Sequence, residues 1–63
     1  MKVIIELHEH NDGSNEVDGI VRDIDAGKVI HRTANYGWGY EPAAIAEAEQ
    51  WADEHGHTII DPA

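Results

Sequence analysis

Apolar and polar residues alternate over the first ten positions of the chain. Positions 3, 5 and 7 carry Val, Ile and Leu, whereas Glu6, His8 and His10 are polar. A period of two is typical of a strand that buries one face. The turn-forming run Asn-Asp-Gly-Ser-Asn follows directly. We therefore expect a strand over residues 2–10 that turns back into a second strand over residues 16–25.

A second hairpin is predicted by the tripeptide Asp-Ala-Gly at positions 25–27, in which Gly27 takes a positive φ. It leads into a third strand over residues 28–35. In the simplest register one face of this hairpin holds the residues Ile20, Ile24, Ile30 and Ala34, together with Arg22 and Arg32. Because that face also holds two arginines, a shift of one residue that groups Val21 with Ile30 is an alternative register.

A helix is predicted after Pro42, since the fixed φ of proline suits the first turn of a helix. We expect it over residues 43–55, with an apolar stripe formed by Ala44, Ile45, Ala48, Trp51 and Ala52. Gly56 ends the helix, and residues 57–60 form a short final strand. The prediction is a single α+β domain over residues 1–63, a three- to four-stranded antiparallel sheet with one helix packed on it in the order βββαβ.

Charge is the strongest feature of the composition. The 63 residues include 13 Asp and Glu but only 4 Lys and Arg, which gives a formal net charge of −9. A surface of this sign repels phosphate backbones and anionic lipids and attracts basic proteins. We therefore expect no direct binding to nucleic acid and no association with membranes. A salt-adapted host or a need for solubility would produce the same composition, so recognition and solvation both remain possible explanations.

Size and residue usage argue against an enzyme. A chain of this length buries only about 60 % of the surface that its unfolded form exposes, so a deep active-site cleft is not expected. The absence of cysteine removes disulfides, thiolate metal sites and cysteine nucleophiles. The single serine, Ser14, lies in a turn and has no nucleophile motif around it. The first apolar run stops at Glu6, too early for a signal peptide, and we expect a cytoplasmic protein.

The carboxylates gather in three parts of the predicted fold, namely the two hairpins and the helix. They are Glu9, Asp12, Glu16 and Asp18 at the first hairpin, Asp23 and Asp25 at the second, and Glu47, Glu49, Asp53 and Glu54 on the helix. Like charges four residues apart destabilise a helix by about 0.2–0.5 kcal/mol, and this helix has no lysine between them. These residues are our first candidates for a surface that recognises a basic partner.

In size, acidity and mixed α/β layout the whole chain resembles the small phage-encoded inhibitors, including anti-CRISPR and anti-restriction proteins, that imitate the charge of nucleic acid. The resemblance is one of class, carried by the carboxylates just named, and it includes no diagnostic motif. It implies a DNA-mimic inhibitor that occupies the nucleic-acid-binding groove of a host protein complex. The five histidines and a loop rich in glycine and aromatic residues depart from this class, because charge imitation needs neither.

That loop, residues 35–41, is the second candidate site. Tyr36, Trp38 and Tyr40 alternate with glycine or precede the helix, and aromatic side chains of this kind are frequent anchors of protein interfaces. In the other interpretation, Tyr36 and Trp38 fold back over the edge of the sheet and the glycines only permit the bend. The alternative function is therefore a small protein- or ligand-interaction module whose acidity serves solubility or salt adaptation.

Histidines provide the third candidate. His8 and His10 project from one face of the first strand, and a zinc or nickel shell could be completed by Glu9, Asp12, His31, His55 or His57. This spacing matches no established metal motif, so we expect solvent-facing imidazoles and neither a metal nor another cofactor. The exposed edge of the final strand would allow a weak homodimer as well as a monomer.

Overall fold

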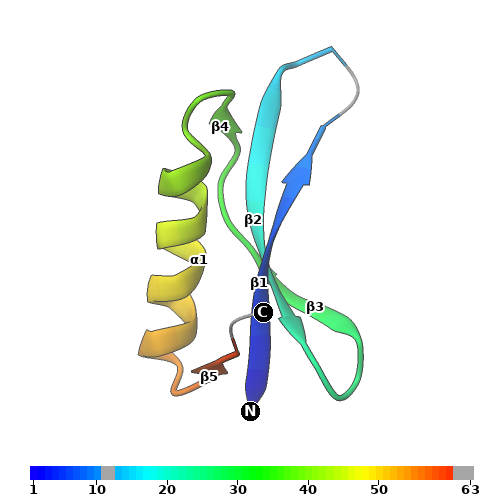
Figure 1. The fold of residues 1–63 in the computed structure, drawn as a ribbon, viewed down its shortest axis with the longest axis vertical. Coiled ribbons are helices and arrows are strands. Elements are labelled where there is room, and N and C mark those ends of the chain that lie inside the picture. Colours follow the sequence, from blue (N-terminus) through cyan, green and yellow to red (C-terminus); the bar gives the residue numbers. More distant parts are fainter. Residues whose placement is uncertain (11–12, 61–63) are drawn as a thin grey trace.

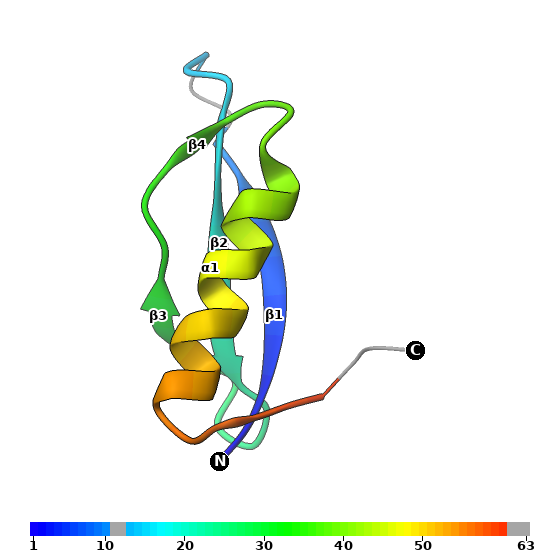
Figure 2. The ribbon, with the colours of Figure 1, turned by 90° about the vertical axis from the view of Figure 1, so that its left-hand side faces the viewer.

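The computed structural model describes residues 1–10 and 13–60 (Figure 1). Its elements are the strands β1 (Lys2–Glu9), β2 (Glu16–Asp23), β3 (Lys28–Arg32) and β4 (Tyr36–Gly37), the helix α1 (Glu41–Glu54) and the strand β5 (Thr58–Ile59). The strands form one sheet in the order β3-β2-β1-β5, and β4 also pairs with β2. The helix packs along one face of this sheet (Figure 2), which confirms the predicted α+β class.

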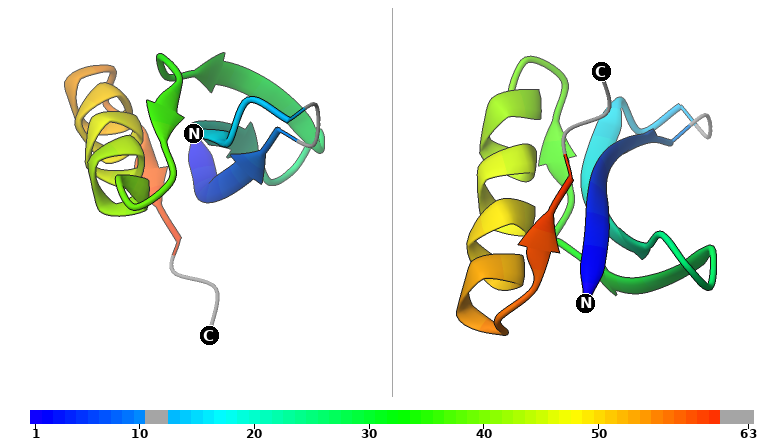
Figure 3. Two further views of the ribbon diagram at one scale, coloured as in Figure 1. Left: turned by 90° about the horizontal axis from the view of Figure 1, so that it is seen from above. Right: turned by 60° about the horizontal axis from the view of Figure 1, so that its bottom comes forward.

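The final strand corrects the prediction of a wholly antiparallel sheet. β5 pairs with β1 in parallel, with Thr58 opposite Lys2 and Ile59 opposite Val3. The direction follows from the helix, since α1 returns the chain to the end of the sheet where β1 begins (Figure 1). Figure 3 shows β5 running beside β1 next to the last turn of α1.

The strand predicted over residues 28–35 is shorter than expected, and a separate strand follows it. β3 ends at Arg32, and after a short crossing β4 pairs with the start of β2, where Tyr36 lies opposite Val17. Thr33 holds the connection between β3 and β4 against β2. Its backbone N–H donates to the carbonyl of Gly19 at 2.9 Å, and its Oγ1 accepts a hydrogen bond from the N–H of Gly19 at 2.8 Å. Part of the predicted loop is thus a strand.

The second hairpin contains a β-bulge. Val21 lies opposite His31 and Arg22 lies opposite Val29, so the intervening Ile30 has no cross-strand partner of its own. Ile30 packs against the same core cluster as Val21. Beyond the bulge Ile20 lies opposite Arg32, as in the simplest register, whereas next to the turn Arg22 lies opposite Val29, which is the register shifted by one residue. Each predicted register therefore holds for one part of the hairpin.

The core lies between α1 and the sheet. Its buried apolar residues include Val3, Val17 and Val21 from the strands and Ala44, Ala48 and Ala52 from the helix. The small side chains of this row of alanines let the helix approach β2 closely. A Cβ atom at Gly19 would lie only 2.5 Å from the Ala44 carbonyl oxygen. Trp51 packs against the core as predicted. Ile45 is 37 % exposed, so its predicted place in the apolar stripe is wrong.

The helix begins at Glu41, two residues before its predicted start, and ends in a Schellman motif. The N–H of Gly56 donates to the Asp53 carbonyl at 3.1 Å, and the N–H of His57 donates to the Ala52 carbonyl at 2.9 Å. Gly56 has a φ of 72°, which confirms the predicted C-terminal glycine. Within residues 1–10 and 13–60, no helix has the length and apolar character needed to span a membrane.

Candidate functional site

Alternate residues of β1 and β2 point away from α1 and form what we call the open face. In the register of the two strands, three cross-strand pairs lie on it: Ile4 with Arg22, Glu6 with Ile20, and His8 with Asp18. The intervening residues, such as Val3 and Val21, point toward the helix because side chains alternate along a strand. The side of the sheet opposite α1 therefore carries the charged groups Glu6, Asp18 and Arg22 and the imidazole of His8.

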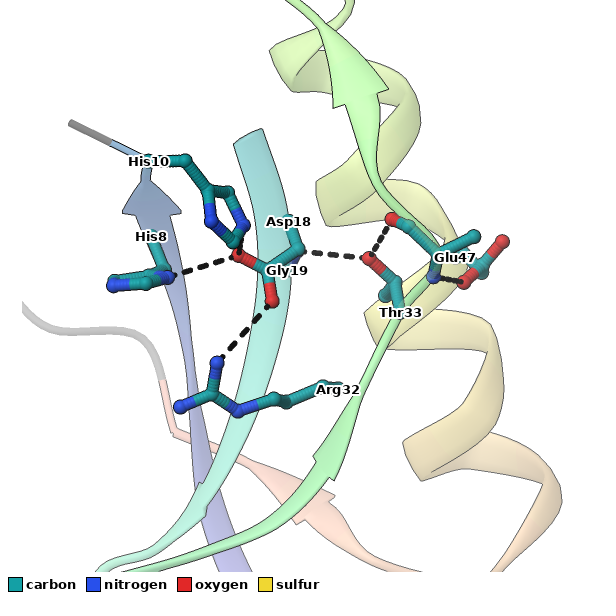
Figure 4. Close-up of polar contacts among 8 residues, drawn as sticks. His8, His10, Asp18, Gly19, Arg32, Thr33 and Glu47 are labelled. Carbon is teal, nitrogen blue, oxygen red and sulfur yellow. Dashed lines mark hydrogen bonds and ion pairs between the residues drawn. The ribbon is translucent and has the colours of Figure 1, made fainter. Parts of the chain in front are cut away.

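Three polar side chains surround Asp18 on the open face (Figure 4). Oδ1 of Asp18 lies 3.1 Å from Nδ1 of His8 and 3.2 Å from Nε2 of His10. A guanidinium nitrogen of Arg32 lies 3.7 Å from Oδ2. Asp18 is only 2 % exposed, and a buried carboxylate is stable only with partners of this kind. We call His8, His10, Asp18 and Arg32 the Asp18 cluster.

Strand register brings the cluster together. His8 lies directly opposite Asp18, and His10 is two residues further along the same face. The N–H of His10 donates to the Glu16 carbonyl at 3.0 Å, which keeps the hairpin paired just beyond the end of β1. Arg32 reaches the carboxylate from β3, on the other side of β2. Asp18, which the sequence assigned to a partner-binding surface, is thus buried and contacts side chains of its own chain.

The histidine nitrogens of the cluster have unusual surroundings. Nε2 of His10 is buried and makes no hydrogen bond within the described residues, although Asp18 is near. The rings of His8 and His10 pack edge to face, with centroids 4.9 Å apart. One donor atom from each of His8, His10 and Asp18 lies within 4.8 Å of the other two. Two imidazole nitrogens and a carboxylate oxygen are a donor set suited to divalent transition metals.

The other three histidines lie around Trp51 at the C-terminal end of α1. The ring of His31 stacks on the indole at a centroid distance of 4.2 Å, and His55 does so at the same distance. His57 stacks at 5.5 Å. These rings pack around Trp51. The structure therefore does not group His31, His55 or His57 with His8 and His10, as the predicted metal shell would require. Asp18 is the third donor beside His8 and His10.

Glu47 joins the helix to the preceding connection. Its carboxylate accepts a hydrogen bond from the Tyr36 hydroxyl at 2.6 Å and another from the Ala34 N–H at 3.0 Å. The bond from Tyr36 is the main reason that the pKa of Glu47 is lowered, and the bond from Ala34 adds to it. The same contact with Glu47 raises the pKa of Tyr36. Tyr36 therefore packs back against the domain, as expected in the interpretation in which the aromatic residues of the loop fold over the sheet edge.

Trp38 and Tyr40 remain at the surface, with 57 % and 65 % of their areas exposed. The backbone between them is nevertheless held in place. The Trp38 N–H donates to the Asn15 carbonyl at 2.9 Å, and the Gly39 N–H donates to the Glu41 carboxylate at 2.9 Å. The interpretation that Trp38 covers the sheet edge is wrong. Both rings are instead presented on an anchored loop.

The remaining predicted carboxylates occupy separate places. Asp23 stabilises the β2–β3 turn, since its Oδ1 accepts a hydrogen bond from the N–H of Asp25 at 3.0 Å. Asp25 itself is exposed. Glu9 is exposed at the end of β1, and Glu16 is half-buried at the start of β2. Asp12 lies outside the described residues.

Charge is divided unevenly along the chain. All four basic residues, Lys2, Arg22, Lys28 and Arg32, lie on β1, β2 and β3. Residues 33–60, which contain the helix and its flanks, include five carboxylates and neither Lys nor Arg. Glu41 and Glu47 make internal hydrogen bonds. The exposed carboxylates on the helix, which we call the acidic face, are Glu49, Asp53 and Glu54.

The described residues enclose no pocket that could hold a small molecule, so the candidate sites are surfaces. No family model matches the chain, and no curated protein or solved structure matches it either.

Proposed function

We propose that this chain is a non-enzymatic acidic binding protein that competes with nucleic acid for a basic groove on a partner protein or complex. The resemblance to small inhibitors of the DNA-mimic class suggested this role. The observation that supports it best is the division of charge, because residues 33–60, which contain the helix, carry five carboxylates and none of the four basic residues. A partner of this kind, together with the cysteine-free composition, would place the activity in the cytoplasm.

The acidic face has the properties that such a competitor needs. Glu49 and Asp53 are four residues apart on a helix, where Cβ atoms at this spacing lie about 5–6 Å apart. The charges are therefore held at nearly fixed separations on a rigid element. Their mutual repulsion destabilises the isolated helix, and attraction to a positively charged groove would offset that repulsion. Glu47 has a different part in this scheme, because its contact with Tyr36 holds the helix against β4.

Electrostatics would also set the kinetics of binding. A net charge of −9 steers the chain toward a positive surface, and such steering is screened over about 8 Å at physiological ionic strength. Association should therefore be fast at low salt and slower as salt is added. The confinement of Lys and Arg to the strands keeps like charges away from a groove that meets the helix.

Affinity capture tests the proposal with two matched variants. The double variant Glu49→Lys/Asp53→Lys changes the net charge from −9 to −5, because each reversal adds two charges. The control Glu9→Lys/Asp25→Lys makes the same change at exposed carboxylates outside the helix. We expect the wild-type chain and the control to retain, from nuclease-treated lysate of the source cells, a partner that double-stranded DNA elutes. The helix variant should not retain it. Equal retention by both variants would contradict the proposal.

A second candidate function follows from the exposure of Trp38 and Tyr40. Two large aromatic rings on an anchored loop could bury against an apolar patch of a partner, with the carboxylates serving only solubility. In that case Trp38→Ala should weaken binding more than either double charge reversal, and binding should depend little on salt. The Trp38 backbone N–H, which holds the loop, is retained in this variant.

A further inference from the structure

We infer that the Asp18 cluster is a binding site for one divalent transition-metal ion, held by Nδ1 of His8, Nε2 of His10 and Oδ1 of Asp18. This inference concerns the open face and is independent of the function proposed for the helix. It assigns a role to the two histidines of β1 that the sequence singled out and to a buried carboxylate that neither proposed binding surface uses.

The three donor atoms already converge. The Asp18 oxygen lies 3.1 Å from the His8 nitrogen and 3.2 Å from the His10 nitrogen, and all three atoms lie within 4.8 Å of one another. In a tetrahedral zinc centre with bonds of about 2.0–2.1 Å, neighbouring donor atoms are roughly 3.3 Å apart. An ion can therefore enter between them after small rotations of the side chains, without movement of the strands.

Burial gives a second and independent reason. Nε2 of His10 is a buried nitrogen without a hydrogen-bond partner among the described residues, and it points toward a carboxylate that is 2 % exposed. Buried polar atoms in native proteins nearly always have a partner. A metal ion between His10 and Asp18 would give this imidazole nitrogen a partner.

Arg32 orients the carboxylate. Its guanidinium lies near Oδ2 of Asp18, which leaves Oδ1 directed at the two imidazoles. Outer contacts of this kind position ligating carboxylates in metal sites. The positive charge of Arg32 opposes a cation, but its side chain is 54 % exposed and therefore screened by solvent. The net charge of −9 favours cation binding overall.

The chemistry of the donors selects the class of metal. Imidazole nitrogens with one carboxylate suit zinc, copper, nickel and cobalt, whereas magnesium and calcium prefer shells made entirely of oxygen. His8 is 45 % exposed at its side chain, so one side of the site is open to solvent. A water molecule can complete the coordination of an ion that has three protein ligands.

Isothermal titration calorimetry with zinc chloride tests the site on the full chain after treatment with a chelator. We expect one ion per chain, with binding weakened at least about tenfold in His8→Gln and in His10→Gln. His55→Gln is the matched control, because His55 lies at the Trp51 stack and should leave zinc binding unchanged. A rise in melting temperature with excess zinc in the wild type, absent in His8→Gln, should accompany the binding.

Two results would overturn the inference. One is the absence of saturable zinc binding by the wild-type chain. The other is a binding isotherm that neither His8→Gln nor His10→Gln alters, since the ion would then be held elsewhere. Because His8 is partly exposed, its replacement should leave the fold intact, which circular dichroism can verify. Asp18→Asn is a less suitable variant, since the buried carboxylate also holds Arg32.

Discussion

Replacing Gly19 with alanine tests how closely α1 must approach β2. A Cβ atom at this position would lie 2.5 Å from the carbonyl oxygen of Ala44, and 3.1 Å from both the Ala44 carbonyl carbon and Cγ2 of Thr33. The nearest atoms belong to the backbone of the helix, so they cannot rotate away as the end of a flexible side chain would. The helix or the strand has to shift, and the buried row of Ala48 and Ala52 has to shift with it.

The expected cost can be placed within a range. Overpacking a core typically costs about 1–3 kcal/mol, and a backbone obstacle places Gly19→Ala near the upper end. Alanine also lowers the entropy of the unfolded chain, which offsets about 0.4–1 kcal/mol of that cost. We therefore expect a loss of roughly 2 kcal/mol in the free energy of unfolding. At about 0.05–0.15 kcal/mol per residue, a chain of this length has only about 3–9 kcal/mol in total.

Urea unfolding followed by tryptophan fluorescence and by circular dichroism measures this loss. With an m-value near 1 kcal/mol/M, the midpoint should fall by about 2 M. Gly37→Ala is the matched control, because a Cβ atom there would meet only Cδ2 of Tyr40 at an ordinary distance of 3.8 Å. It should be neutral or slightly stabilising. A Gly19→Ala variant as stable as the wild type, or an equal loss in both variants, would refute the close contact between α1 and β2.

Three further predictions concern side chains. Thr33→Val should cost about 1–3 kcal/mol in urea unfolding, because it leaves the Gly19 N–H without its acceptor, whereas Thr33→Ser should retain most of the stability. The pKa of Glu47 is lowered in the fold, so its stabilising contribution is complete above about pH 4.5 and is lost as pH falls through the folded pKa. The pKa of Tyr36 is raised, so its stabilising contribution is present below pH 10.0 and is lost as pH rises through the folded pKa. In Tyr36→Phe the alkaline dependence of the unfolding free energy should disappear, and the acid dependence should become smaller, because the bond from Ala34 to Glu47 remains. An unchanged profile would argue against the Tyr36–Glu47 contact. Trp51→Ala should cost about 2–3 kcal/mol, less than the value for a fully buried Trp, while the exposed Trp38→Ala should change stability by less than about 0.5 kcal/mol. Similar losses in both tryptophan variants would contradict the assignment of Trp51 to the core.

Local signals in the sequence were sufficient for most of the elements. The alternation in the first strand, Pro42 in the first helical turn and Gly56 at the helix end act over a few residues, and each is confirmed. The bulge at Ile30 and the parallel pairing of β5 were missed. Ile30 packs against a core cluster that includes Ala48 and Ala52 of the helix, and β5 directly follows the helix. Both features therefore involve the packing of α1 on the sheet, which no short stretch of residues encodes.

The sites show the same limit. His8 and His10 were found by their spacing, but Asp18 was assigned to the acidic surface. Counting both strands outward from the turn-forming run would have placed Asp18 opposite His8. The contact of Glu47 with Tyr36 spans 11 residues between a strand and a helix, and no local pattern indicates it.

Displacement of nucleic acid is the most direct test of the proposed function. The chain is titrated into a complex of the captured partner with fluorescently labelled double-stranded DNA, and the anisotropy of the DNA is recorded. We expect the wild-type chain and Glu9→Lys/Asp25→Lys to release the DNA. The variant Glu49→Lys/Asp53→Lys should require at least about tenfold more protein for the same release, equivalent to about 1.4 kcal/mol. If the DNA stays bound at saturating wild-type chain, or if both double variants release it equally well, the acidic face is not a competitor of nucleic acid.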